Sequence, residues 1–165
     1  MSDSKSVPTT SSKPDVEINE INVEEFDESF EIEMKKRLKL EKRKQDRLDM
    51  IALLDSQLII EKLSTTSSRV SVKFKFQTIE QRKGYPRIYY QCDLTIGFDK
   101  GRELKSFIGT GLSHRMAKFA ACKMATLHLD QIQMIRINND LTFDQYLNMK
   151  YNDPKIEINY VNFSN

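Results

Sequence analysis

The sequence predicts an α+β fold, an α-β-β-β-α domain whose three-stranded antiparallel sheet carries its helices on one face. Three observations indicate this fold. The region between Val16 and Lys83 contains neither glycine nor proline and opens with a long run of helix-forming residues. Three segments of alternating apolar and polar residues come next, and a second helical pattern follows them. An N-terminal helical extension and a C-terminal tail with a helix and a strand flank this domain.

Charge and composition divide the chain of 165 residues into four parts. Residues 1–22, rich in Ser, Thr and acidic residues, are typical of a disordered leader. Residues 23–49 are a charged helical extension, residues 50–131 the folded domain, and residues 132–165 a C-terminal extension. The net charge of the chain is only +2, but residues 69–131 alone carry +7. A basic body of this kind indicates a polyanionic partner.

The first helical run ends at a Ser/Thr-rich break at residues 64–68 and fits either one long helix or two in succession. Its last part carries an apolar stripe expected to dock on the core, formed by Ile51, Leu54, Leu58, Ile59 and Leu63. The segment 35–47 before this stripe is densely basic. We interpret it as a solvated helix that extends a polyanion-binding surface, with a nuclear signal or a helix paired with the acidic leader as alternatives.

Three strands are predicted at residues 69–77, 87–97 and 103–108, because apolar and polar residues alternate there. A loop with Gly84 and Pro86 joins the first two strands, and a tight turn at residues 99–102 joins the last two. This order predicts an antiparallel meander with one solvated face, so the helices should cover the other face.

The second helix follows two glycines. Gly109 and Gly111 are expected to turn the chain out of the third strand, and Ser113 is placed to cap the helix. Small residues then recur at helical spacing, on a face comprising Ala117, Ala120, Ala121, Met124 and Ala125. Because small side chains allow a close approach, this face is predicted to pack on the sheet.

The start of this second helix is basic. His114, Arg115 and Lys118 lie in its first turn and a half. Cations there oppose the helix dipole, whose N-terminal end already carries partial positive charge. An anion bound at that end would resolve the conflict, since free backbone N–H groups and cations together form a phosphate site. The simpler alternative is a solvated helix face.

Residues 109–129, GTGLSHRMAKFAACKMATLHL, resemble the C-terminal motif of the double-stranded-RNA-binding domain family, approximately G-x-G-x-S-K-K-x-A-K-x-x-A-A-x-x-A-L-x-x-L. The coinciding positions are Gly109, Gly111, Ser113, Ala117, Lys118, Ala121, Ala125 and Leu129. His114 and Arg115 stand where the family has two lysines. The predicted element order over residues 50–131 also fits this family.

The resemblance implies binding to A-form RNA across two successive minor grooves and the phosphates between them, over about 16 base pairs. The implied RNA-contacting residues are His114, Arg115 and Lys118 at the helix start, Lys83, Gly84, Tyr85 and Arg87 in the loop between the first two strands, and Glu61 or Gln57 on the first helix. The family often has G-P-x-H in that loop. This chain has GYPRI, so Arg87 or Tyr85 would have to replace the histidine.

Other classes of function find little support in the sequence. Cys92 and Cys122 suit a reducing compartment, and with His114 and His128 they lack the spacing of a zinc site. We expect no cofactor, no metal and no enzymatic activity. No apolar run reaches the length of about 18 residues that a membrane span needs, and residues 1–15 lack the apolar core expected of a secretory signal. The expected location is cytoplasmic or nuclear.

The expected function is that of an accessory protein that binds double-stranded RNA by shape, in RNA processing, silencing or sensing. The expected partners are the RNA duplex and a larger RNA-processing enzyme or assembly, with a second copy of the chain as a further candidate. The alternative is a module of the same fold that has lost RNA binding and acts in dimerisation or as an adaptor.

The last 34 residues predict two elements. LTFDQYLNMKY is typical of a short amphipathic helix that starts near Thr142. KIEINYVNF, residues 155–163, alternates like a strand. A lone strand needs a neighbour, so this segment is predicted to join the sheet of the domain or to pair with another chain by strand addition.

Overall fold

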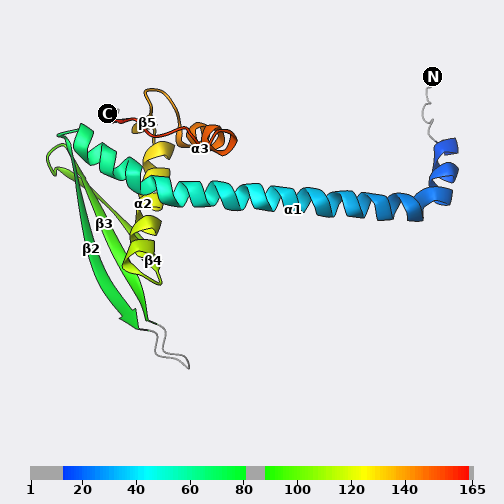
Figure 1. Ribbon diagram of the computed structural model, residues 1–165, viewed down its shortest axis with the longest axis horizontal. Coiled ribbons are helices and arrows are strands. Elements are labelled where there is room, and N and C mark those ends of the chain that lie inside the picture. Colours follow the sequence, from blue (N-terminus) through cyan, green and yellow to red (C-terminus); the bar gives the residue numbers. More distant parts are fainter. Residues whose placement is uncertain (1–12, 81–87, 164–165) are drawn as a thin grey trace, which may run out of the picture. The chain divides into compact units, whose positions relative to one another are not determined.

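The computed structural model describes residues 13–80 and 88–163, and it describes side chains from residue 27 onward. The chain divides into two compact units, Met1–Gln45 (the N-terminal unit) and Asp46–Asn165 (the C-terminal unit). The elements, labelled as in Figure 1, are α1 (Lys13–Thr66), β2 (Val70–Glu80), β3 (Ile88–Phe98), β4 (Glu103–Gly111), α2 (His114–Gln131), β5 (Ile135–Ile137), α3 (Phe143–Asn152) and β6 (Val161–Phe163). The fold is therefore α+β, with the predicted α-β-β-β-α order at its centre.

The first helical run is one helix, not two, and it begins at Lys13. The helix therefore includes residues 13–22 of the predicted leader, while residues 1–12 lie outside the described residues. Pro14 suits the first turn of a helix, where its missing N–H would have no partner in any case. Beyond Pro14 the chain contains no glycine or proline up to the end of α1 at Thr66, so nothing in this stretch interrupts the helix.

The sheet of the C-terminal unit is antiparallel with the strand order β2-β3-β4. Val70 pairs with Phe98 at one end, and Cys92 at the centre of β3 pairs with Phe76 on one side and Gly109 on the other. The turn at 99–102 is confirmed, with positive φ at Asp99, Lys100 and Gly101. Figure 1 shows α2 and the last turns of α1 on the same side of this sheet, as predicted.

Gly109 and Gly111 do not form the turn that the sequence suggested. Both belong to β4, which runs three residues beyond its predicted end at 108. A Cβ atom on Gly109 would lie 2.2 Å from the backbone nitrogen of Ala121, and one on Gly111 would lie 2.7 Å from that of Ala117. The glycines therefore let the backbone of β4 approach the backbone of α2 directly at these two positions.

The buried faces of the two long helices differ in part from the predicted ones. On α1 the buried residues include Ala52, Asp55, Ser56, Ile59, Ile60 and Leu63, whereas the predicted stripe members Leu54 and Leu58 are exposed. On α2 the buried residues are Ala117, Phe119, Ala121, Cys122, Ala125, Thr126 and Leu129, and the predicted member Met124 is exposed. The small-residue contact is confirmed at Ala117, Ala121 and Ala125.

A buried polar contact attaches α3 to α1. The hydroxyl of Tyr146 donates a hydrogen bond of 2.5 Å to Oδ2 of Asp55, and the Lys150 ammonium lies 3.2 Å from the same oxygen. Burial, followed by this hydrogen bond, raises the pKa of Tyr146. The predicted start of this helix is confirmed, because Thr142 caps it in a capping box with Gln145.

The C-terminal strand is shorter than predicted and pairs elsewhere. Only Val161–Phe163 is a strand, and it pairs antiparallel with β5 in a separate two-stranded sheet. The prediction that it joins the main sheet is therefore wrong. Its neighbour is instead β5, the short strand that follows α2. β5 has only three residues, too few to show an alternating pattern in the sequence.

Asn138, just after β5, holds the segment before β6 in place. Its side-chain nitrogen donates to the carbonyl of Glu157 at 2.9 Å, and its side-chain oxygen accepts from the backbone N–H of Asn159 at 2.7 Å. Its backbone N–H donates to the carbonyl of Tyr160 at 2.9 Å. The φ of Asn138 is 49°, a region that asparagine tolerates better than most residues.

Candidate nucleic-acid interface

The N-terminal end of α2 is capped as predicted. The Ser113 hydroxyl oxygen accepts a hydrogen bond of 3.1 Å from the backbone N–H of Met116. No acidic residue lies in the first turn of the helix. The helix therefore begins with His114 and Arg115 directly after the cap, and both of these side chains are exposed.

His114 packs against two aromatic rings of the sheet. Its imidazole lies edge-on to Tyr90 of β3, with ring centroids 4.3 Å apart, and 5.1 Å from the ring of Phe76 of β2. Such pairs stabilise by about 0.5–1.5 kcal/mol beyond the area that they bury. The imidazole thus contacts both strands at the junction of α2 and the sheet.

The two longer basic side chains are also supported by aromatic rings. The Lys118 ammonium lies 4.6 Å from the ring centroid of Phe74 on β2, and the Arg115 guanidinium lies 5.2 Å from that of Phe119 on α2. A cation in this position is attracted by the negative face of the ring, by about 0.5–1 kcal/mol at exposed sites. Lys118 is half-buried, so its alkyl stem is packed while its charged end lies at the surface.

The structure therefore brings together three of the predicted residues, His114, Arg115 and Lys118, and adds aromatic side chains that support them. These are Phe74, Phe76, Tyr90 and Phe119. For Phe74 and Phe76 the signal in the sequence was the alternation of basic and aromatic residues along 73–76, which places both rings on the face of β2 that α2 covers.

Glu61 lies near the C-terminal end of α1 and is exposed. Its Oε1 accepts a hydrogen bond of 2.8 Å from the side-chain nitrogen of Gln57, one helical turn earlier. Glu61 and Gln57 are thus hydrogen-bonded to each other. These are the two side chains that the family resemblance implies as alternatives for a minor-groove contact. The other predicted group, Lys83, Gly84, Tyr85 and Arg87, lies outside the described residues.

The two cysteines lie in the core beneath this surface, and both are free thiols. Burial, followed by the neighbouring Cys92, raises the pKa of Cys122 to about 12. Lys118 and Glu61 act on this thiol in opposite directions, the first lowering its pKa and the second raising it. Charges from both α2 and α1 therefore act on this buried thiol of α2.

Neither a cluster of metal-binding side chains nor a membrane-spanning helix is found among the described residues. Among residues 27–80 and 88–163, whose side chains the structure describes, no group of three or more His, Cys, Asp or Glu side chains could hold a metal ion. No helix in the same ranges combines the length and the apolar character of a membrane span. Comparisons with protein-family models, with curated proteins and with solved structures found no match.

Proposed function

We propose that the C-terminal unit is a double-stranded-RNA-binding domain and that the protein binds A-form RNA duplexes by shape. One observation carries the proposal. Three basic side chains, His114, Arg115 and Lys118, lie at the N-terminal end of α2, and each is packed against an aromatic ring. Negative charge is absent from the first turn of this helix. A phosphate group would supply it and would also accept hydrogen bonds from the free N–H groups.

The chemistry favours duplex RNA over sequence-specific DNA binding. The A-form major groove is too deep and narrow for side chains to reach the base edges, but the phosphates on its two sides are accessible to a helix end. Reading bases in the DNA major groove would need side chains such as Asn, Gln or Arg along a helix face that enters it. On α2, the exposed side chains between Met116 and Leu127 are apolar instead: Met116, Met124 and Leu127.

We further propose an accessory role, in which the protein binds the duplex and the chemistry on RNA belongs to a partner such as a larger RNA-processing enzyme. The supporting observation is the make-up of the surface at the start of α2. Its side chains can bind phosphate, but they do not include paired carboxylates that would position an attacking water or hold magnesium.

Fluorescence anisotropy with labelled nucleic acids tests the proposal. An RNA duplex of about 20 base pairs, long enough for the family footprint, should bind more tightly than the single strand or a DNA duplex of the same sequence. Three phosphate contacts predict a slope of about −2 to −3 in a plot of log affinity against log salt. Absence of duplex binding in dilute buffer would refute the proposal and would favour the alternative of an adaptor without RNA binding.

The matched variants are Lys118→Glu and Lys123→Glu. Both change the net charge equally and both lie on α2, but only Lys118 belongs to the basic start of the helix. Lys118→Glu should weaken duplex binding by more than about tenfold, because it replaces a phosphate contact with repulsion. Lys123→Glu should have a much smaller effect. Equal losses in the two variants would show that general charge, and not this surface, binds the RNA; urea unfolding checks that both are folded.

A further inference from the structure

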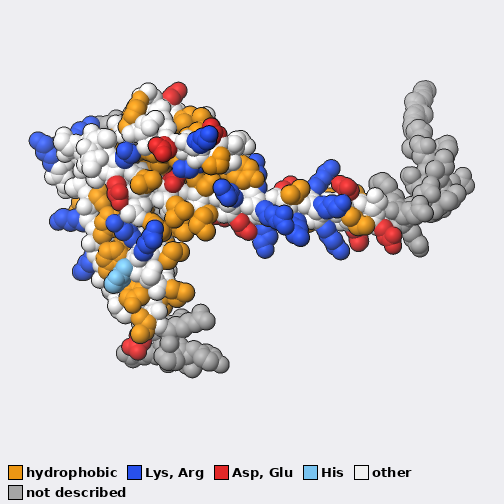
Figure 2. Space-filling view, viewed as in Figure 1, with side chains coloured by type: hydrophobic (Ala, Val, Ile, Leu, Met, Phe, Trp, Pro, Cys, Tyr) orange, Lys and Arg blue, Asp and Glu red, His pale blue; other side chains and the backbone are white. Residues whose placement is uncertain are grey.

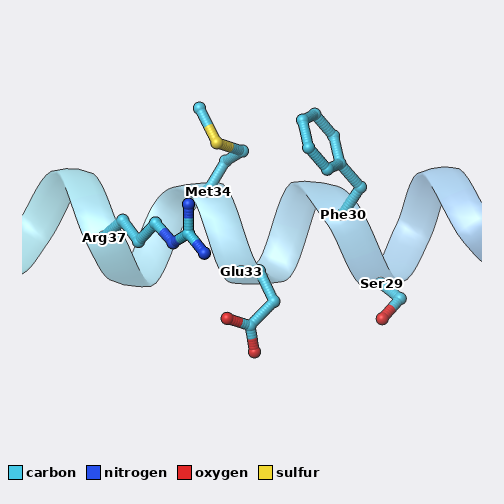
Figure 3. A pocket seen from close by; sticks show the side chains of 5 residues that line it. All are labelled: Ser29, Phe30, Glu33, Met34 and Arg37. Atoms are coloured by element: carbon cyan, nitrogen blue, oxygen red, sulfur yellow. The ribbon is translucent and has the colours of Figure 1, made fainter.

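A stripe of exposed apolar side chains runs along α1 within the N-terminal unit. Phe30, Met34 and Leu38 recur at every fourth residue, so they lie on one side of the helix. Their side chains are 53%, 37% and 57% exposed. Figure 3 shows Phe30 and Met34 projecting to the same side, while Glu33 projects to the other. A helix with such a stripe is expected to bury it against another element.

A hollow in this stripe has the form of a socket in helix pairing. It is lined by Ser29, Phe30, Glu33, Met34 and Arg37 (Figure 3). Four of these residues stand at positions i, i+3, i+4 and i+7 of the helix. This is the set of four neighbours that surrounds one inserted side chain when two helices pack knobs into holes. The hollow is therefore suited to one side chain of a facing helix.

The charges on the two sides of Met34 are of opposite sign. On its N-terminal side, residues 27–33 contain four acidic and no basic side chains. On its C-terminal side, residues 35–42 contain five basic and one acidic side chain. Figure 2 shows the basic side chains gathered along one stretch of α1, with acidic side chains toward its N-terminal end. A helix of this pattern is complementary to itself when it is reversed in direction.

We propose that residues 27–42 of α1 form an interface with a second copy of this chain, in which the two helices pack antiparallel about a two-fold axis near Met34. In this register Met34 of each copy enters the hollow of the other, where a flexible thioether fills an irregular gap well. Phe30 then faces Leu38 of the second copy. The interface is isologous, because the same surface is used by both copies.

Charge selects the antiparallel direction. In the proposed register Glu33 faces Lys35 of the second copy, and Glu31 faces Arg37. A parallel pair in register would instead place each of these side chains opposite its own equivalent, and like charges across a helix pair destabilise it. Charge also favours a protein partner over RNA for this stripe, because the acidic segment 27–33 would repel phosphate.

Sedimentation velocity of the full chain without RNA tests the proposal, with Met34→Glu and Ile32→Glu as matched variants. Both place a glutamate at an exposed apolar position of α1, but Ile32 lies about 160° around the helix from Met34. We expect a dimer for the wild type and for Ile32→Glu. Met34→Glu should weaken self-association by about 100-fold or more, because it brings two like charges together at the axis.

A monomeric wild type, or equal dissociation of the two variants, would overturn the proposal. Disulfide trapping tests the direction of the helices. A mixture of Phe30→Cys and Leu38→Cys chains should cross-link, whereas either variant alone should not. Cross-linking of Phe30→Cys with itself would mean a parallel pair and would overturn the proposed register. An intact dimer in Met34→Glu, with weaker duplex binding, would assign the stripe to RNA instead.

Discussion

Replacing Gly109 with alanine should force β4 away from α2. The added Cβ would lie 2.2 Å from the backbone nitrogen of Ala121 and 2.4 Å from the carbonyl oxygen of Ala117. Ordinary contact begins near 3.4 Å, so the strand and the helix must separate by about 1.2 Å at this point. Both neighbours are backbone atoms, which means that no side chain can rotate to make room.

Two opposing effects set the change in the free energy of unfolding that Gly109→Ala causes. Overpacking that cannot be relieved costs about 3 kcal/mol, the upper end of the usual range. Alanine also restricts the unfolded chain more than glycine does, and this stabilises the folded state by about 0.4–1 kcal/mol. The free energy of unfolding should therefore fall by about 2 kcal/mol. With a denaturant slope of about 2 kcal/mol per molar urea, the unfolding midpoint should drop by about 1 M.

Gly97→Ala is the matched control, measured by the same urea titration. Its Cβ would meet the Ser71 Oγ at 2.6 Å and the Leu104 Cδ2 at 3.2 Å, both of them ends of side chains that can move. Its cost should stay below about 1 kcal/mol. If Gly109→Ala unfolds at the same urea concentration as the wild type or as Gly97→Ala, the direct backbone contact between β4 and α2 does not exist.

Two further predictions concern the buried face of α2. The Thr126 hydroxyl is buried without a hydrogen-bond partner among the described residues, so Thr126→Val should raise the free energy of unfolding by about 1 kcal/mol, and a loss in thermal or urea unfolding would contradict this. The pKa of Cys122, about 12 against an ordinary 9.0, means that the folded thiol keeps its proton while the unfolded one ionises. Stability should therefore be unaffected by this group below pH 9 and should fall as the pH rises from 9 towards 12, and by less in Cys122→Ala; equal falls in both proteins would reject the assignment.

Much of the sheet could be predicted because each of its strands carries a local signal. The alternation in 69–77 and 87–97 follows from one face packing against helices while the other meets water. The caps at Ser113 and Thr142 were likewise predictable, since an N-cap depends on a side chain within three residues of the N–H that it accepts from.

The predictions that differ from the structure concern features that depend on contacts between distant segments. The residues 50–60 of α1 are apolar on several sides, so the sequence offers more than one stripe, and contacts with distant segments decide which is buried. One of these contacts places Asp55 in the core, where Tyr146 and Lys150 bind it from α3. The role of Gly109 was hidden for a similar reason, because a glycine that turns a chain and one that admits a neighbouring backbone look the same in a sequence.

The candidate site divides in the same way. The basic residues at the start of α2 were found from a local motif of fixed spacing. The aromatic rings under Lys118 and His114 belong to β2 and β3, and only the folded sheet brings them there. Which ring supports which basic side chain depends on the strand register and on the distance between helix and sheet. The sequence motif of residues 109–129 determines neither of these.

Slow hydrolysis of the Asn138 side-chain amide would weaken the attachment of the C-terminal segment. The side-chain amide of asparagine hydrolyses slowly in water and leaves a carboxylate. The amide nitrogen of Asn138, which donates a hydrogen bond to the carbonyl oxygen of Glu157, would be replaced by a carboxylate oxygen that cannot donate. Two acceptor oxygens would then face each other, and the hydrogen bond would be lost. An aged preparation should therefore accumulate a more acidic species in which residues 157–160 are loosened while the three-stranded sheet stays intact.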